Sequence, residues 1–105
     1  RSNQSNWYPL REYKGDRKSF ENVESSMFIR LSVKDQPGVL AKIAGTLGEN
    51  NVSIESVIQE GRGEIAELVI ITHDAKEKNL SASVETIRAL SVVDDIDSII
   101  RVYSG

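Results

Sequence analysis

The stretch Asp35-Gln36-Pro37-Gly38-Val39-Leu40 marks the point where the hydrophobic pattern of this sequence changes its period. Before it, residues 27–34 alternate between apolar and polar side chains, which indicates a half-buried strand. After it, apolar residues recur at helical spacing as far as Leu47, which indicates an amphipathic helix. Pro37 is tolerated in a first helical turn, and Asp35 or Gln36 is available as a cap. The stretch is therefore predicted to be a strand-to-helix turn.

The remaining pattern completes a small fold around this turn. Residues 52–58 alternate as a second strand, Gly61-Arg62-Gly63 is typical of a hairpin turn, and residues 65–72 are nearly continuously apolar. Such an apolar run predicts a central strand covered on more than one side. A second amphipathic helix is predicted over residues 80–90, and a last alternating strand over 96–102. The order βαββαβ predicts an α+β, ferredoxin-like sandwich, with a four-stranded antiparallel sheet and two helices on one face.

Residues 1–26 and 27–103 differ in their hydrophobic pattern. Residues 1–26 are polar, rich in charge and without a period, and they are interpreted as a linker or the tail of a preceding domain. Trp7, Tyr8 and Tyr13 within them indicate packing against a neighbour. Residues 27–103 are predicted to form the folded module. Because the first residue is Arg1, we expect the chain to be a piece of a longer protein.

Composition narrows the function classes. A chain of 105 residues, 39% hydrophobic and 28% charged, is expected to form one globular domain. No run approaches the roughly 20 apolar residues of a membrane span, so no membrane partner is expected. A net charge of -3 argues against nucleic acid as a partner. The absence of cysteine excludes thiolate metal sites and favours the cytoplasm.

The residue types needed for catalysis are scarce. His73 is the one histidine, at the end of a predicted strand, and its neighbour Asp74 is expected to point elsewhere. It is interpreted as a solvent-exposed loop residue. Neither a nucleophile in a recognisable setting nor a metal-ligand spacing is present, so no catalytic and no metal-binding residue is predicted. The third strand lacks aromatic residues for base stacking, which disfavours an RNA-binding sheet.

The turn itself favours a small zwitterionic ligand. Pro37 stiffens it, and Gly38 lets a ligand approach the backbone. The N–H groups of the first helical turn, at the positive end of the helix dipole, suit a carboxylate. Asp35 is placed to pair with an ammonium group. Asp-x-Pro-Gly turns also begin many helices with no ligand, so the turn persuades only in combination with other residues.

That combination resembles a known family. Residues 34–44 (KDQPGVLAKIA), followed by Asn50-Asn51-Val52-Ser53-Ile54, strongly resemble ACT domains, which are ligand-binding modules attached to enzymes of amino-acid metabolism. The resemblance covers residues 27–103. More narrowly, the amino-acid sequence from Ile29 to Gln59 resembles the C-terminal regulatory domain of bacterial homoserine dehydrogenases. Such an enzyme would use NAD(P), bound in its catalytic part, and the resemblance implies no cofactor in residues 27–103.

The resemblance also implies partners and a site. ACT domains pair side by side into a larger sheet, here as a homodimer, with an amino-acid effector at the interface, threonine being the expected one. Carried over by position, the ligand-binding candidates are Asp35, Gln36, Pro37, Gly38, Val39, Leu40, Asn51, Val52, Ser53 and Ile54. Asparagine often occupies the position of Ser53 in effector-binding relatives. A ligand-free dimerisation module, or the ACT domain of another enzyme of amino-acid metabolism, are therefore the alternatives.

Overall fold

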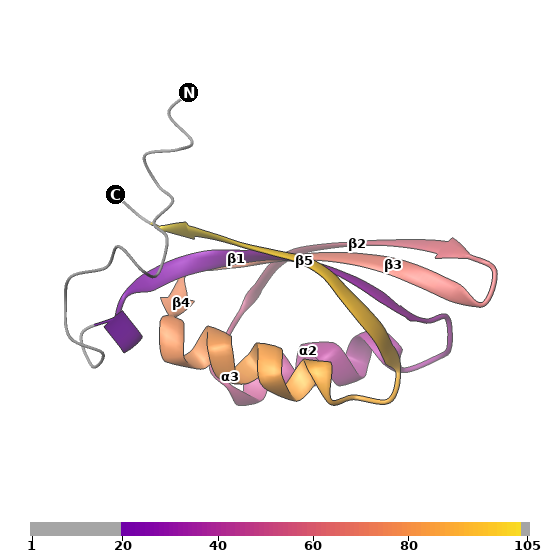
Figure 1. Ribbon diagram of the computed structural model, residues 1–105, viewed down its shortest axis with the longest axis horizontal. Coiled ribbons are helices and arrows are strands. Elements are labelled where there is room, and N and C mark those ends of the chain that lie inside the picture. Colours follow the sequence, from indigo (N-terminus) through magenta and orange to yellow (C-terminus); the bar gives the residue numbers. More distant parts are fainter. Residues whose placement is uncertain (1–19, 104–105) are drawn as a thin grey trace, which may run out of the picture.

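The computed structural model describes residues 20–103, and predictions that fall on residues 1–19 lie outside them. The elements in chain order are β1 (Glu24–Lys34), α2 (Val39–Glu49), β2 (Ile54–Arg62), β3 (Ile65–Thr72), β4 (Ala75–Lys76), α3 (Glu77–Arg88) and β5 (Val93–Tyr103). The predicted βαββαβ order is confirmed (Figure 1). The structure adds β4, a two-residue strand that pairs with Glu24 and Ser25 at the start of β1.

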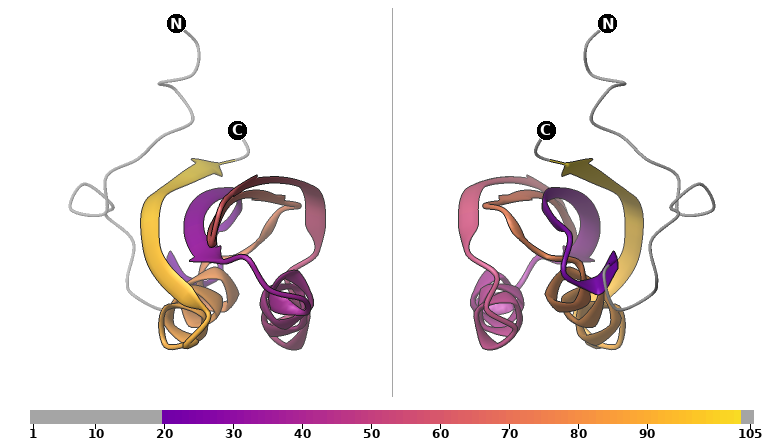
Figure 2. Two further views of the ribbon diagram at one scale, coloured as in Figure 1. Left: turned by 90° about the vertical axis from the view of Figure 1, so that its right-hand side faces the viewer. Right: turned by 90° about the vertical axis from the view of Figure 1, so that its left-hand side faces the viewer.

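The sheet is antiparallel, and β1 lies inside it. β1 pairs with β3 on one side and with β5 on the other, and β3 pairs in turn with β2. Among the described residues, β2 and β5 are therefore the outer long strands. Both helices cover the same face, with α2 below the β2 side and α3 below the β5 side (Figure 2). We call the opposite face, which no described helix covers, the open face.

The core lies between the sheet and the two helices. Alternate residues of β1 and β3 point into it, as the period of two requires. They pack against the apolar stripes of α2 and α3. The side chains with no more than 1% exposure include Met27, Ile29, Leu31, Val33, Ile43, Leu47, Ala66, Leu68, Ile70, Leu80 and Ile87. The predicted inward stripe of the first strand is thereby confirmed, and so are Ile43 and Leu47 of α2 and Leu80 and Ile87 of α3. The prediction that Thr46 faces outward is wrong, since it is buried at 7% exposure, and Leu90 of the predicted second stripe follows the end of α3.

Bulges overturn the predicted alternation of the outer strands. In β2 a register shift lies between Ile54 and Ser56, so Val57 turns inward and Ile58 turns outward with 63% exposure. In β5 a register shift opposite Arg30 and Leu31 puts Ile96 on the helix side and Ile100 on the open face. The prediction that Ile54 and Ile58, or Ile96 and Ile100, share a face was wrong. One extra residue in a strand moves every later side chain to the other face.

The turns also differ in detail from the sequence prediction. β3 spans the predicted residues 65–72, but Gly61 and Arg62 belong to β2, and the hairpin turns at Gly63 and Glu64. Gly63 has φ of 79°, the left-handed conformation that favours glycine. Within the described residues, β3 is covered by helices on one side only. Its Ile65, Val69 and Ile71 lie on the open face and are only partly buried or exposed.

Candidate functional site

The β1–α2 turn is built on glycine and lacks a side-chain cap. Gly38 is the N-cap residue of α2, with φ of 84° and ψ of -5°, and its carbonyl accepts the first helical hydrogen bond from the Lys42 N–H at 3.0 Å. The prediction that Asp35 or Gln36 caps the helix was wrong, since no side chain does so. A Cβ at Gly38 would meet nothing within 4 Å. Glycine is therefore needed here for its backbone conformation, with open space beside it.

The turn is held against the β2–β3 hairpin. The backbone N–H of Asp35 donates to the carbonyl of Glu64 at 2.9 Å, and the N–H of Gln36 donates to the carbonyl of Lys34 at 3.0 Å. The Asp35 carboxylate extends over the hairpin, where a Cβ added to Gly61 would lie 3.0 Å from its Oδ2. Gly61 thus leaves the space that this carboxylate occupies. Both contacts fix the direction of Asp35 in a turn that is otherwise exposed.

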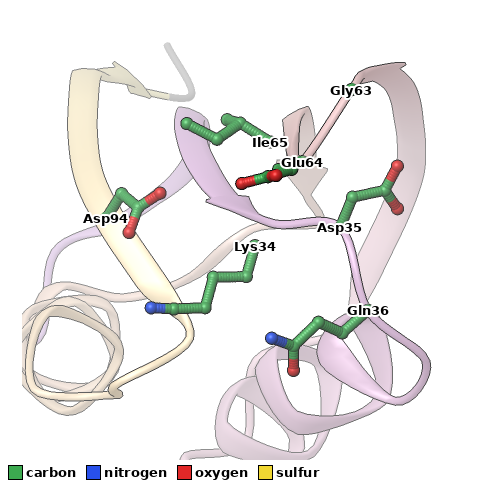
Figure 3. A pocket seen from close by; sticks show the side chains of 7 residues that line it. All are labelled: Lys34, Asp35, Gln36, Gly63, Glu64, Ile65 and Asp94. Atoms are coloured by element: carbon green, nitrogen blue, oxygen red, sulfur yellow. The ribbon is translucent and has the colours of Figure 1, made fainter.

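An open pocket of about 600 Å³ lies beside this turn. Its lining consists of Lys34, Asp35, Gln36, Gly63, Glu64, Ile65 and Asp94. In Figure 3 the Asp35 carboxylate points toward the hairpin, whereas the Gln36 amide points toward the start of α2. The pocket therefore combines three carboxylates, one ammonium group and one amide around an apolar Ile65. This set can hold both ends of a small zwitterion, with the ammonium end preferred by the excess of carboxylates.

The predicted site residues divide into two groups within the chain. Asp35 and Gln36 lie beside the first residues of β3, because the Asp35 N–H donates to the Glu64 carbonyl and Lys34 pairs with Ile65. Ser53 lies at the opposite end, where its carbonyl accepts the His73 N–H at 2.9 Å, just after β3 ends. α2 has 11 residues and joins the two groups, so they are about 16 Å apart along its axis. One copy of the chain does not bring them together.

Exposure also sorts the predicted residues. Val39 and Val52 are core residues, with 5% and 3% exposure. Leu40 and Ile54 are half-buried against the core, whereas Pro37, Gly38, Asn51 and Ser53 are exposed. Asn51 has φ of 61°, a left-handed conformation that asparagine tolerates better than most residues, and it ends the turn after α2. The surface available to a ligand consists of the exposed and half-buried members at each end.

Several pocket residues were not predicted. Lys34 pairs with Ile65, which brings the β2–β3 hairpin next to the β1–α2 turn. The alternating pattern of β1, together with the glycines that mark the hairpin, could have indicated this contact. Asp94 arrives from the start of β5, and no local pattern marks it as a neighbour of Lys34. His73 is exposed as predicted. In the part of the chain that the structure describes, no group of three or more acidic or histidine side chains is arranged to hold a metal ion. Neither described helix is long and apolar enough to cross a membrane.

The chain is a small α+β sandwich with a glycine-built turn beside an open pocket, and comparison with known proteins assigns its class. The family model of the ACT domain matches residues 27–92, and the chain belongs to this family. The resemblance to ACT domains that the sequence indicated is thereby confirmed. Two related sequences and one related structure narrow the comparison further, and all three are homoserine dehydrogenases.

The chain is 40% identical over 86 residues to the homoserine dehydrogenase of Neisseria gonorrhoeae, covering 80% of this chain and 20% of that protein. It is 34% identical over 94 residues to the Bacillus subtilis enzyme, covering 87% and 22%. The crystal structure of a homoserine dehydrogenase from Thiobacillus denitrificans superposes with a TM-score of 0.70 at 33% identity, covering 78% of this chain and 18% of that one. The chain thus spans about a fifth of the length of the relatives it matches.

Proposed function

We propose that this chain is the regulatory domain of a homoserine dehydrogenase and that it binds an amino acid, threonine foremost, between two copies of itself. The relatives support the enzyme, since the chain matches about a fifth of each. The observation that carries the shared site is the separation of the two groups of predicted ligand residues at opposite ends of α2. A single ligand reaches both groups only if a second copy supplies one of them.

Pairing along the edge strand β2 provides that arrangement. β2 has no partner strand on its outer side among the described residues, and an edge strand presents unpaired backbone groups. In a two-fold antiparallel pair centred on Ile58, Ile54 of one copy lies opposite Arg62 of the partner subunit. The Asn51–Ile54 segment then approaches the partner's turn, because Asp35 lies over Gly61 next to that end of β2. Ile58, 63% exposed, packs against its own copy at the axis.

The chemistry of the turn suits the two ends of an amino acid. The first turn of α2 has neither a side-chain cap nor an acidic residue, so its positive end is available to a carboxylate. Three of the residues that line the pocket, Asp35, Glu64 and Asp94, carry carboxylates that can attract an ammonium group. Coupling to an attached catalytic part needs about 1–3 kcal/mol, which corresponds to a 5–150-fold change in affinity.

A thermal-denaturation screen of amino acids against the chain tests this proposal. Threonine at about 100 times its Kd should raise the free energy of unfolding by roughly 2.7 kcal/mol. Asp35→Asn should weaken that effect while leaving the unliganded stability nearly unchanged, because Asp35 is exposed. Asp95→Asn, an exposed aspartate outside the pocket, is the matched control and should retain the full effect. No shift with threonine, other aspartate-family or branched-chain amino acids would exclude the effector role.

A ligand-free dimerisation module is the second candidate. The observation in its favour is Ser53, which is exposed and shorter than the asparagine of effector-binding relatives, next to an unoccupied β2 edge. Sedimentation of the wild type and of Ile58→Lys separates the two candidates, since a lysine at the axis repels its own copy. A dimer lost in Ile58→Lys, with no response to any amino acid in the wild type, would favour the structural module. A ligand-dependent dimer would favour the effector site.

A further inference from the structure

The open face of the sheet carries apolar side chains that no described element covers. Among residues 20–103, the exposed large hydrophobic side chains are Ile58, Ile65, Ile100 and Val102, at 63%, 46%, 47% and 44%. Register places all four on this face, since Ile100 lies opposite Phe28, Val102 opposite Ser26, Ile65 opposite Lys34, and Ile58 opposite Val69. Exposed apolar surface gathered on one face is typical of an interaction site.

The sequence of β3 independently indicates a covered face. Residues 65–72 are apolar at nearly every position, which is typical of a strand buried on both sides. The described helices bury only Ala66, Leu68, Ile70 and Thr72, on one side. Val69 and Ile71 on the other side are half-buried through neighbouring side chains of the same face. The composition of the central strand therefore fits a molecule in which the open face has a cover.

The apolar side chains concentrate at the end of the sheet where the chain enters it. Phe28 pairs with Ile71 on one side and Ile100 on the other, and Val102 follows next to Ser26. We call Phe28, Ile71, Ile100 and Val102 the entry patch. β1 begins at Glu24, four residues before Phe28. Residues 1–19 precede β1 in the sequence, and Figure 1 shows the start of β1 at this end of the sheet.

We propose that residues 1–19 dock on the open face of the sheet and cover the entry patch. This segment holds Trp7, Tyr8, Leu10 and Tyr13, and aromatic side chains of this kind are enriched where a protein surface is covered by a partner. Tyr13 precedes Ser25 by 12 residues, and an extended chain of that length reaches about 40 Å. Four strands span only about 15 Å, so the segment can pass the end of the sheet and lie across the patch.

Charge favours this occupant over a second copy of the chain. Residues 1–19 contain five Lys or Arg and two Asp or Glu, a formal charge of +3. Since the whole chain has a net charge of -3, the rest carries -6. Two copies of the acidic part repel each other, whereas a basic segment is attracted to it. The attraction is one of net charge, since the open face itself carries both signs, with Arg30 and Lys34 beside Glu67. Docking also connects the preceding segment to the sheet that carries the β1–α2 turn at its far end.

Trp7 is the single tryptophan of the chain, so its fluorescence tests the docking directly. In the folded wild-type chain of 105 residues, we expect its emission to be blue-shifted from that of the urea-denatured chain and protected from acrylamide. Ile100→Ser should move the emission and the quenching constant toward the denatured values. Ile65→Ser is the matched control, because Ile65 has the same exposure and lies on the same face about 20 Å away along β1. It should leave the signal unchanged.

Circular dichroism confirms that each variant is folded, and Val102→Ser replaces Ile100→Ser should the latter unfold. A solvent-like Trp7 emission in the folded wild type overturns the proposal. So does a protected Trp7 that responds equally to Ile65→Ser and Ile100→Ser. Protection that disappears on dilution, together with a change of oligomeric state, assigns the face to a second copy and also overturns it. The measurement uses no amino acid, so its outcome is independent of the effector proposal.

Discussion

The two strand-to-helix junctions of this domain differ in the charge that lies near the positive end of the helix dipole. At the start of α3, Glu77 is only 6% exposed and lies in the first helical turn, where its charge complements the helix dipole. Its carboxylate accepts two hydrogen bonds from Arg101, both at 2.9 Å, and one from the Ser81 hydroxyl at 2.6 Å. Neither helix has a side-chain hydrogen bond at its N-cap, but the first turn of α2, unlike that of α3, contains no acidic residue.

The difference separates structure from function. At the α3 junction the Glu77 carboxylate lies in the first helical turn, and the Glu77 N–H also holds the segment entering β1 by donating to the Val23 carbonyl at 2.8 Å. At the α2 junction no acidic side chain lies in the first turn, and the residues just before the helix, Asp35 and Gln36, line the open pocket. Under the proposed function, the carboxylate of the ligand takes the place near the start of α2 that the Glu77 carboxylate takes near the start of α3.

Removing Arg101 should break the α3 junction with the largest effect. Arg101→Ala leaves the Glu77 carboxylate buried without its cation, and loss of one partner of a buried pair costs about 3–5 kcal/mol. We expect the lower end, because the Arg101 side chain keeps 21% exposure. Urea denaturation measures the loss. Arg30→Ala is the control, since its pair with Glu67 at 3.5 Å is 49% and 29% exposed and should cost at most about 1 kcal/mol. Equal losses for the two variants would contradict the comparison.

Gly38→Ala should damage the α2 junction through the backbone alone. With φ of 84°, an alanine there is strained by roughly 1–2 kcal/mol, although a Cβ meets no atom within 4 Å. Gly45→Ala, in the middle of the same helix and equally uncrowded, should instead stabilise the domain by about 0.5–1 kcal/mol. Denaturation midpoints of the two variants should therefore move in opposite directions. A neutral Gly38→Ala would show that the turn can adopt another conformation.

These junctions also show how far the sequence alone reaches. The Pro37-Gly38 pair predicted a turn and a helix, and the two apolar stripes predicted which faces are buried, because those features depend on local residues. The cap was predicted wrongly because the Asp35 N–H is taken by Glu64, a contact that no local pattern marks. The bulges in β2 and β5 were missed because one extra residue leaves the composition of a strand unchanged. The pairing of Glu77 with Arg101, like the place of Asp94 in the pocket, follows only from the folded topology.

Copying the α3 solution onto α2 should sharpen the comparison. Ala41 is exposed and is the third residue of α2, where a carboxylate lies near the positive helix end. Ala41→Glu should stabilise the unliganded domain by about 0.3–1 kcal/mol. It should also weaken the binding of an amino-acid carboxylate, with which it competes. Ala41→Gln has nearly the same size without the charge and should leave binding closer to wild type. Tighter binding in Ala41→Glu would place the ligand's ammonium group, instead of its carboxylate, at the helix end.

An effect confined to alkaline pH is expected at Tyr103, which is buried beside Glu77 and Arg101 of the α3 junction. Desolvation by burial, with the negative charge of Glu77 beside it, raises the pKa of the Tyr103 hydroxyl, and Arg101 opposes this only in part. In the unfolded chain the pKa is about 10. Between that value and the raised pKa, the folded chain keeps a proton that the unfolded chain has lost, so the free energy of unfolding falls as the pH rises. The stabilisation that depends on the neutral Tyr103 hydroxyl is therefore fully present well below pH 10, and it is lost as the pH rises from about 10 through the raised pKa.

Tyr103→Phe removes this titration. We expect the difference in unfolding free energy between wild type and variant to be constant up to about pH 9 and then to shift against the wild type by at most about 1.4 kcal/mol per pH unit. Urea denaturation at intervals from neutral pH to about pH 11 measures it, and the other tyrosines and the lysines cancel because both chains contain them. Two parallel curves would mean that the hydroxyl ionises equally well in the folded chain. The α3 junction would then be more open to water than its buried Glu77 indicates, and the contrast with α2 would rest on the Arg101 pair alone.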